Sequence, residues 1–371
     1  MIARQPHSMT PDSARDRPLP TLGLTMGDPL GIGPEVTVKA LADRDLRSRA
    51  RFLIFGMGGA LHAAAHKAGI EPFWWRASHD SPALEATGSH DVVLVDYDDP
   101  RAREAHSEEA GAATSIPDAR ARPTKSGGAA SFQFVEDAIA SARSPAHAAL
   151  RVDAIVTAPI SKEAWAMAGR GKYPGHTELL ATRFGVSRSR MMFVAPQLRV
   201  ILATTHIPLM DIRNTLTIGR VFDTIDLGAQ ACRRLGVEKP RIAVCGLNPH
   251  AGEHGLMGDE EERIIEPAIR LACEQGIDAH GPFPGDTIFN SAIKGRFDLV
   301  VAMYHDQGLI PVKLLAFDCA VNATIGLPIV RTSPDHGTAY DIAGRNVADP
   351  GSMKAAIDLA ITLSASPCPS A

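Results

Sequence analysis

Three short apolar runs of the chain each end in a histidine. RVILATTH ends at His206, RIAVCGLNPH at His250 and FDLVVAMYH at His305. Imidazoles delivered to one edge of a sheet, or to facing edges across a subunit contact, make a three-nitrogen metal site with open positions for substrate oxygens. A single histidine of this kind is more often a hydrogen-bonded loop residue, but the shared placement favours a metal site. Asp306 is either a carboxylate that fixes the His305 tautomer or a turn residue.

Polar residues suited to an anionic substrate follow another apolar run. RVDAIVTAPISKEAW places Thr157, Ser161 and Lys162 just beyond a buried strand, and KYPGHTELLA then presents His176 and Thr177 after a Pro-Gly turn. These residue types also begin and cap helices, so the segment is either an ordinary helix start or a polar rim for an anion.

Charged residues later in the chain extend this set. Lys313 in IPVKLL and Arg331 in LPIVRTS would supply a point charge and a bidentate fork to a carboxylate or phosphate. Alternatively, Lys313 extends its stem across an apolar surface to water. Asn322 in AVNATIG is suited to the same anion, and Asp286 in PGDTIF adds a carboxylate.

The apolar runs indicate the elements that must position these residues. TLGLTM, RFLIFG, DVVLVDY and RVDAIVTAP join the three histidine-terminated runs, and segments of helical length separate them. Short runs rich in Val, Ile and Leu with intervening helices predict an α/β protein with a largely parallel sheet. Ligands in such folds gather beyond the carboxyl ends of the strands, where several of these polar residues lie.

Two loops resemble those of the isocitrate and isopropylmalate dehydrogenase fold. GDPLGIGPEV follows the first strand and HGTAYDIAGRNVADP lies late in the chain, with a helix expected from about Ala339. The first is a weak dinucleotide signal by itself, because the third glycine of that fingerprint is missing. By resemblance, the late loop binds the adenosine half of NAD through His336, Gly337, Thr338 and Ala343.

The middle of the chain resembles the 4-hydroxythreonine-4-phosphate dehydrogenase family. The motifs that carry this resemblance are TAPISKEAW, GHTELLA, TTHIPL, GLNPHAGE, GPFPGDTIF, YHDQGLIPVK and VNATIGLPIVRTSPDHGTA. The match extends from about Leu22 to about Leu359. It implies two α/β domains with the active site in the cleft between them, at the interface of a homodimer.

The resemblance implies a role for each matching residue. His206, His250 and His305 bind a divalent cation, two from one subunit and one from its partner. Zinc is expected first, with magnesium, cobalt or manganese as alternatives. The implied substrate contacts are His176, Thr177, Lys313, Asn322 and Arg331, and the implied catalytic residues are Lys313 and Asp286.

The reaction implied is the NAD-dependent oxidation of the 3-hydroxyl of 4-phosphohydroxy-L-threonine. Loss of carbon dioxide then gives 3-amino-2-oxopropyl phosphate, on the route to pyridoxal phosphate, with Lys313 as a candidate proton donor. AGRGKYPGHTE and GDEEERIIEPAI also resemble relatives that oxidise 4-phospho-D-threonate, 4-phospho-D-erythronate or a dicarboxylated dihydrodiol. A three-histidine metal hydrolase and a non-catalytic binding protein are the alternatives from other classes, but the hydrolase leaves the late loop unexplained.

The amino-acid composition excludes some classes of binding partner. The 371 residues are 45% hydrophobic and 22% charged, and the formal net charge of -4 gives no basic excess for a nucleic acid or an anionic membrane. No apolar run approaches the length of a membrane span and no secretory signal is visible, so a cytoplasmic location is expected. The predicted organisation is a flexible leader (1–20), a discontinuous NAD-binding domain (21–150 plus 310–371), and a metal, substrate and dimerisation domain (151–309).

Overall fold

One sheet runs through the whole molecule. The computed structural model describes residues 19–98, 121–143 and 150–365, so nearly all of the predicted leader lies outside the described residues. The described strands form a twelve-stranded sheet in the order β3-β4-β2-β1-β5-β12-β11-β6-β7-β10-β8-β9. The strands are β1 (Thr21–Thr25), β2 (Arg51–Gly56), β3 (Trp75–Ser78), β4 (Val92–Asp96), β5 (Ala154–Thr157), β6 (Arg190–Val194), β7 (Arg199–Leu202), β8 (Ile242–Cys245), β9 (Ala279–Phe283), β10 (Leu299–Ala302), β11 (Val321–Ile325) and β12 (Val330–Pro334).

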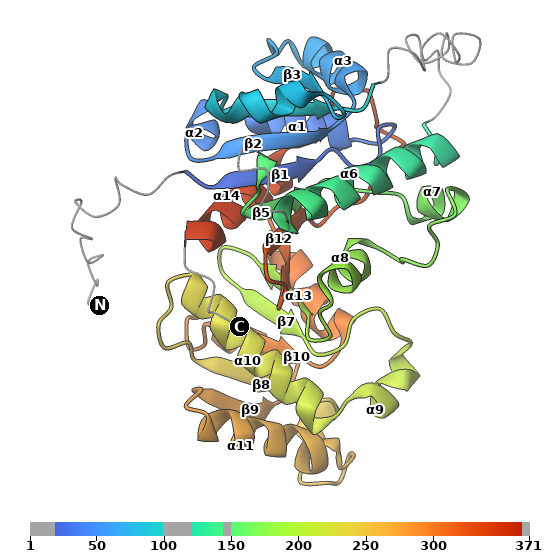
Figure 1. Cartoon of the computed structure of the whole chain (residues 1–371). Coiled ribbons are helices and arrows are strands. Elements are labelled where there is room, and N and C mark those ends of the chain that lie inside the picture. Colours follow the sequence, from blue (N-terminus) through green and yellow to red (C-terminus); the bar gives the residue numbers. More distant parts are fainter. Residues whose placement is uncertain (1–18, 99–120, 144–149, 366–371) are drawn as a thin grey trace, which may run out of the picture.

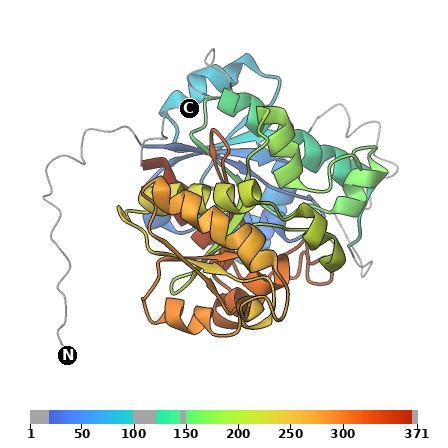
Figure 2. The same cartoon turned by 90° about the horizontal axis from the view of Figure 1, so that it is seen from below.

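Helices flank this sheet. They are α1 (Gly33–Leu41), α2 (Arg44–Arg47), α3 (Gly58–Ala68), α6 (Lys125–Arg143), α7 (Lys162–Met167), α8 (His176–Phe184), α9 (Ile212–Thr215), α10 (Ile218–Arg234), α11 (Glu266–Glu274), α12 (Ile288–Ile293), α13 (His305–Ala316) and α14 (Gly351–Ala365). Figure 1 shows α13 and α8 in the middle of the molecule, between the part that holds β1 and α14 and the part that holds β8 and β9. In Figure 2, the yellow α10 and the orange α11 lie side by side across one face.

The sheet is mostly parallel, which confirms the predicted α/β class. Antiparallel pairing occurs where β11 meets β12 and β6, and where β6 meets β7. The seven apolar runs singled out in the sequence form β1, β2, β4, β5, β7, β8 and β10. None of the helices in the described ranges is both long and apolar enough to cross a bilayer.

Three neighbouring strands bring the histidine-bearing loops to one edge. β10 pairs in parallel with β7 on one side and with β8 on the other. Because parallel strands end at the same edge, the segments leading to His206, His305 and His250 all leave the sheet on the same side. This arrangement is the one that the sequence pattern predicted.

Both faces of these three strands are buried, which explains their continuous apolar sequence. Ile201 packs in a cluster with α10 and α11, whereas its neighbours Val200 and Leu202 pack with α12 and α13 on the other face. Each fully buried aliphatic side chain contributes about 1.5–3 kcal/mol of transfer free energy. A separate cluster combines β1, β2, β4 and β5 with α14. The division into domains 21–150 plus 310–371 and 151–309 stays a prediction.

The helix expected from about Ala339 is absent, and that expectation was wrong. A turn occupies residues 340–344, and the next helix is α14. Ala339 has φ 43° and Asn346 has φ 61°, and such left-handed backbone cannot continue a right-handed helix. The late loop therefore crosses the end of β12 in an irregular conformation.

Candidate active site

Two of the three predicted metal ligands lie side by side. The ring centroids of His206 and His305, which follow β7 and β10, are 5.5 Å apart. His305 begins α13, and its Nδ1 hydrogen-bonds the Asp306 carboxylate at 2.7 Å, so that Nδ1 is the protonated nitrogen and Nε2 remains available to a metal. Burial first, and then the charge of Lys162, hold the pKa of His206 below its usual value. Neutral imidazole is the form that binds a divalent cation.

The third predicted ligand, His250, is not part of this pair within one chain. It follows β8, its side chain is 62% exposed, and its Nδ1 lies 2.9 Å from Glu253 Oε2. Across the described ranges, no three His, Cys, Asp or Glu side chains gather into a metal-binding group. The imidazole pair fits a divalent cation in its donor type, and it leaves coordination positions to be filled from elsewhere.

The loop that carries His250 has an unusual backbone held by a buried carboxylate. His250 has φ 54° and Glu253 has φ 44°, a region that costs of order 1–3 kcal/mol for a non-glycine residue. Glu261 Oε1 accepts hydrogen bonds from the backbone N–H groups of Leu247 and Asn248, both at 2.7 Å. These contacts fix the start of the loop that carries His250.

Arg331 is a buried cation that forms no ion pair with any carboxylate of the described residues, although the charge of Glu178 acts on it from further away. Its Nη1 donates to Thr324 Oγ1 at 3.1 Å and its Nη2 to Thr157 Oγ1 at 2.8 Å. Its Nε is buried without a hydrogen-bond partner, and no carboxylate of the described residues forms an ion pair with it. Burial lowers the pKa of Arg331, yet a guanidinium stays charged. Such a cation implies a place for an anion.

Three further predicted residues also hold buried polar atoms without a partner. His176 Nε2, Asn322 Oδ1 and His336 Nε2 have no hydrogen-bond acceptor or donor beside them. The His176 ring packs edge-on against Trp165, and burial, followed by the charge of Arg331, holds its pKa well below the usual value. Buried polar atoms are almost always hydrogen-bonded, so these atoms fit groups of a bound substrate and cofactor.

An ion pair that spacing alone did not reveal involves Lys313. Its Nζ lies 3.3 Å from Oδ2 of Asp335, which directly precedes the late loop. Burial raises the pKa of Asp335, and the charge of Lys313 opposes that shift. Because His305 and Lys313 are eight positions apart on α13, this helix spans about 12 Å from the histidine pair to the late loop.

The other predicted residues are less constrained. Thr177 is the second residue of α8 and is partly buried, and Asp286 is exposed in the loop before α12. In the late loop, a Cβ at Gly337 would meet no atom within 4 Å, and Ala343 packs against the cluster around β1. The open space at Gly337 suits the close approach of a cofactor.

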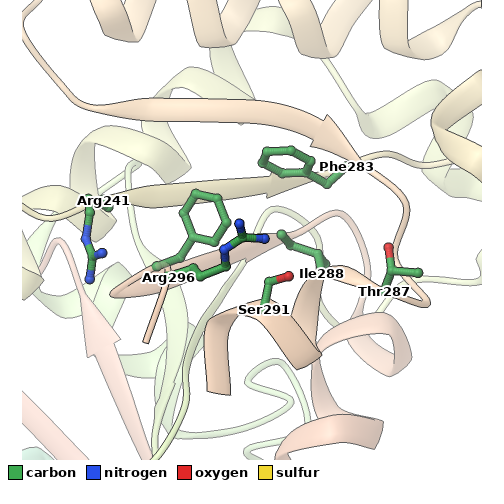
Figure 3. Close-up of a pocket in the computed structure, with 7 residues that line it drawn as sticks. Arg241, Phe283, Thr287, Ile288, Ser291 and Arg296 are labelled. Atoms are coloured by element: carbon green, nitrogen blue, oxygen red, sulfur yellow. The ribbon is translucent and has the colours of Figure 1, made fainter. Parts of the chain in front are cut away.

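A separate pocket lies away from these residues. A cavity of about 570 Å³ is lined by Arg241, Phe283, Thr287, Ile288, Ser291, Arg296 and Phe297 (Figure 3). Arg241 and Phe297 precede β8 and β10, Phe283 ends β9, and Ile288 and Ser291 belong to α12, so this cavity lies between α12 and the β8–β9 end of the sheet. None of the predicted site residues lines it. The candidate site is therefore defined by its polar atoms rather than by this hollow.

Comparison with known proteins finds relatives that match most of the chain. The family model described as pyridoxal phosphate biosynthetic protein PdxA matches residues 75–360. D-threonate 4-phosphate dehydrogenase of Cupriavidus necator is 44% identical, covering 91% of this chain and 96% of its own length. 4-Hydroxythreonine-4-phosphate dehydrogenase of Desulfosudis oleivorans is also 44% identical, over 93% of this chain and 96% of its own.

Solved structures of similar proteins share the fold of this chain. The crystal structure of a 4-hydroxythreonine-4-phosphate dehydrogenase from Burkholderia phymatum aligns with a TM-score of 0.72 at 42% identity, covering 94% of this chain and 99% of the other. The sequence match spans nearly the whole of each relative, and the fold is shared. The chain therefore belongs to the family of the pyridoxal phosphate biosynthetic protein PdxA.

Proposed function

We propose that this oxidoreductase oxidises the 3-hydroxyl of 4-phosphohydroxy-L-threonine with NAD and a divalent metal, and releases carbon dioxide to give 3-amino-2-oxopropyl phosphate. The observation that carries the proposal is the buried Arg331 guanidinium, which has an unpartnered Nε and no paired carboxylate among the described residues. A phosphorylated acid supplies the missing negative charge. The names of the relatives support the reaction class and the phosphorylated four-carbon substrate.

In this mechanism, the chain first fixes the anionic substrate. Arg331, held by Thr157 and Thr324, donates to an anionic oxygen. His176 stays neutral because its pKa is depressed, and it hydrogen-bonds the substrate through Nε2. Asn322 Oδ1 accepts from a substrate hydroxyl or ammonium, and Thr177 and Lys313 complete the binding set.

The metal and the cofactor contribute chemistry that no side chain supplies. When bound, a divalent cation lowers the pKa of the substrate alcohol and stabilises developing negative charge, while NAD accepts the hydride. His206 and His305 would hold the cation, with His250 from a second copy as the third ligand. Imidazole donors favour zinc over magnesium, and cobalt and manganese are alternatives. His336, Gly337, Thr338 and Ala343 would hold the cofactor.

Proton transfer falls to Lys313 and Asp286. The Lys313 ammonium, held by Asp335 at 3.3 Å, delivers a proton to the substrate carbon after carbon dioxide leaves. Asp286, which is exposed in the loop before α12, accepts the proton of the alcohol. Both roles rest on the family resemblance.

A homodimer completes the proposed metal site. Exposed apolar side chains lie within a few residues of the two histidine loops: Leu209 and Met210 follow His206, and Leu256 follows His250. Met210 and Leu256 are 84% and 83% exposed, which is unfavourable unless another surface covers them. In a two-fold dimer, the exposed His250 of one copy meets the His206 and His305 pair of the other.

A second substrate has equal support from sequence. The Cupriavidus necator relative, named for D-threonate 4-phosphate, is as similar as the relative named for 4-hydroxythreonine 4-phosphate. The two substrates share the 4-phosphate, the 3-hydroxyl and the carboxylate, and differ at carbon 2. 4-Phospho-D-threonate, and with it 4-phospho-D-erythronate, is therefore the alternative substrate for the same site.

A thermal-shift experiment separates the dehydrogenase from a three-histidine hydrolase. The purified, zinc-loaded protein is heated with NAD+, with the phosphorylated substrate, or with neither. The dehydrogenase requires NAD+ to raise the melting temperature, because a ligand that binds only the folded state stabilises it. A protein stabilised by the substrate and zinc but not by NAD+ would support the hydrolase.

A further inference from the structure

The early glycine turn, residues 27–33, is in direct backbone contact with the late loop. The Ile32 N–H donates to the Thr338 carbonyl oxygen at 2.9 Å. A Cβ on Gly31 would lie 2.9 Å from that same oxygen, so only glycine permits this approach. The two motifs, which lie near opposite ends of the chain, therefore form one structural unit.

A side-chain hydrogen bond closes this unit. The Tyr340 hydroxyl donates to Asp28 Oδ2 at 2.6 Å, and Leu30 N donates to Asp28 Oδ1 at 3.0 Å. Asp28 is fully buried, and no cation of the described residues forms an ion pair with it. Hydrogen bonds alone therefore compensate its charge, which makes the Tyr340 hydroxyl costly to remove. We call this hydrogen bond the Tyr340–Asp28 latch.

The latch also connects the late loop to the substrate side of the site. Asp28 N donates to the Pro159 carbonyl oxygen at 2.9 Å. Pro159 lies two residues after Thr157, whose hydroxyl accepts from Arg331. Asp28 thus contacts the late loop through its carboxylate, and the segment that supports Arg331 through its backbone N–H.

Between Asp335 and this latch, the late loop is held at Thr338 by the Ile32 N–H, and the two residues before Thr338 are loosely packed. His336 Nε2 is buried without a partner, and Gly337 has no neighbour within 4 Å of its Cβ position. Ala339 has a strained φ of 43°. Such a conformation persists only when surrounding contacts impose it. The latch at the next residue is one of these contacts, beside the hydrogen bond from Ile342 N to the Ala339 carbonyl oxygen at 3.1 Å.

We propose that Tyr340, through Asp28, is a positioning residue that holds the late loop in the shape that binds a nicotinamide dinucleotide. The proposal rests on the proposed function, which assigns that loop to the cofactor. It predicts that removal of the Tyr340 hydroxyl weakens dinucleotide binding without changing how the substrate anion binds at Arg331. The affinity loss is the cost of ordering a loop that is no longer preorganised.

The test uses Tyr340→Phe, with Asp28→Asn as a second variant. Calorimetric titration of the zinc-loaded protein with NAD+ measures the dissociation constant. We expect it to rise about tenfold in both variants, the size of one hydrogen bond to a charged group. The KM for NAD+ should rise in parallel, while kcat at saturating NAD+ and the KM for the phosphorylated substrate stay within about twofold. Hydrogen exchange of residues 336–343 should quicken.

Tyr97→Phe is the matched control. Tyr97 donates to Asp137 Oδ2 at 2.6 Å, so the same chemical pair at the same distance is removed away from the late loop. The control should lose stability without losing affinity for NAD+. If Tyr340→Phe binds NAD+ as tightly as Tyr97→Phe does, the latch has no positioning role and the proposal is wrong. If the wild type itself binds no NAD+, the proposed function fails and the latch proposal fails with it.

Discussion

The imidazole rings of His206 and His305 lie with their centroids 5.5 Å apart, although they come from different strands of the sheet. They meet because β7 and β10 are parallel neighbours and end at the same edge. Asp306 fixes the tautomer of one ring, and burial holds the pKa of the other low. One ring therefore has a fixed orientation and the other is held neutral before any cation arrives.

Removing one of these rings should abolish stabilisation by metal. His305→Ala is expected to show no rise in melting temperature when zinc is added, whereas the wild type gains several degrees. His280→Ala is the control, because His280 forms a similar exposed pair with Asp278 at 2.6 Å. A His305→Ala protein that zinc still stabilises like the wild type would exclude His305 as a ligand.

A site shared between subunits should show complementation. His206→Ala and His250→Ala homodimers are each expected to be inactive. Unfolding and refolding them as a mixture creates heterodimers with one intact site, which should restore about a quarter of the wild-type activity. A mixture of His206→Ala with His305→Ala should restore none, because both substitutions damage the same half-site. Equal recovery in the two mixtures would contradict the sharing of ligands.

The sequence predicted the strand ends better than it predicted the loops. Apolar runs identify β7, β8 and β10 because both faces of these strands are buried. The same criterion misses β11 and β12, where the polar residues Asn322 and Arg331 interrupt the apolar pattern. Contacts such as Lys313 with Asp335 depend on how the chain folds back, and no local spacing encodes them.

Substituting Arg331 should separate stability from activity. Arg331→Met removes a buried charge that has no carboxylate partner among the described residues. We expect an unchanged or higher melting temperature, because an unpaired buried cation is unfavourable in the substrate-free protein. Steady-state kinetics should show kcat/KM falling by about a hundredfold or more, as expected when a charged hydrogen bond to an anion is lost. Near-normal kcat/KM in the variant would remove Arg331 from the substrate site.

The neutral state of His176 should make stability depend on pH. Its pKa in the folded protein lies well below the unfolded value, so acidification protonates the unfolded state first. Stability is therefore fully present above about pH 6.5, and below it falls by up to about 1.4 kcal/mol per pH unit from this group alone. Urea unfolding between about pH 7 and pH 5 should show a shallower decline for His176→Gln.

The control for this prediction is His66→Gln, at an exposed position of α3. It should keep the wild-type slope, since an exposed histidine loses little hydration on folding. Parallel slopes for the wild type and His176→Gln would mean that His176 is charged in the folded protein. The neutral hydrogen-bonding role assigned to it would then be wrong.

The most direct test of the dehydrogenase assignment follows NADH by its absorbance. The zinc-loaded protein is given NAD+ with 4-phosphohydroxy-L-threonine and, in separate reactions, with 4-phospho-D-threonate or 4-phospho-D-erythronate. The account predicts NADH formation with the first compound, which chelation and His250→Ala abolish. Turnover of the other two alone would keep the mechanism and change the substrate. No NADH from any of the three would contradict the proposed function.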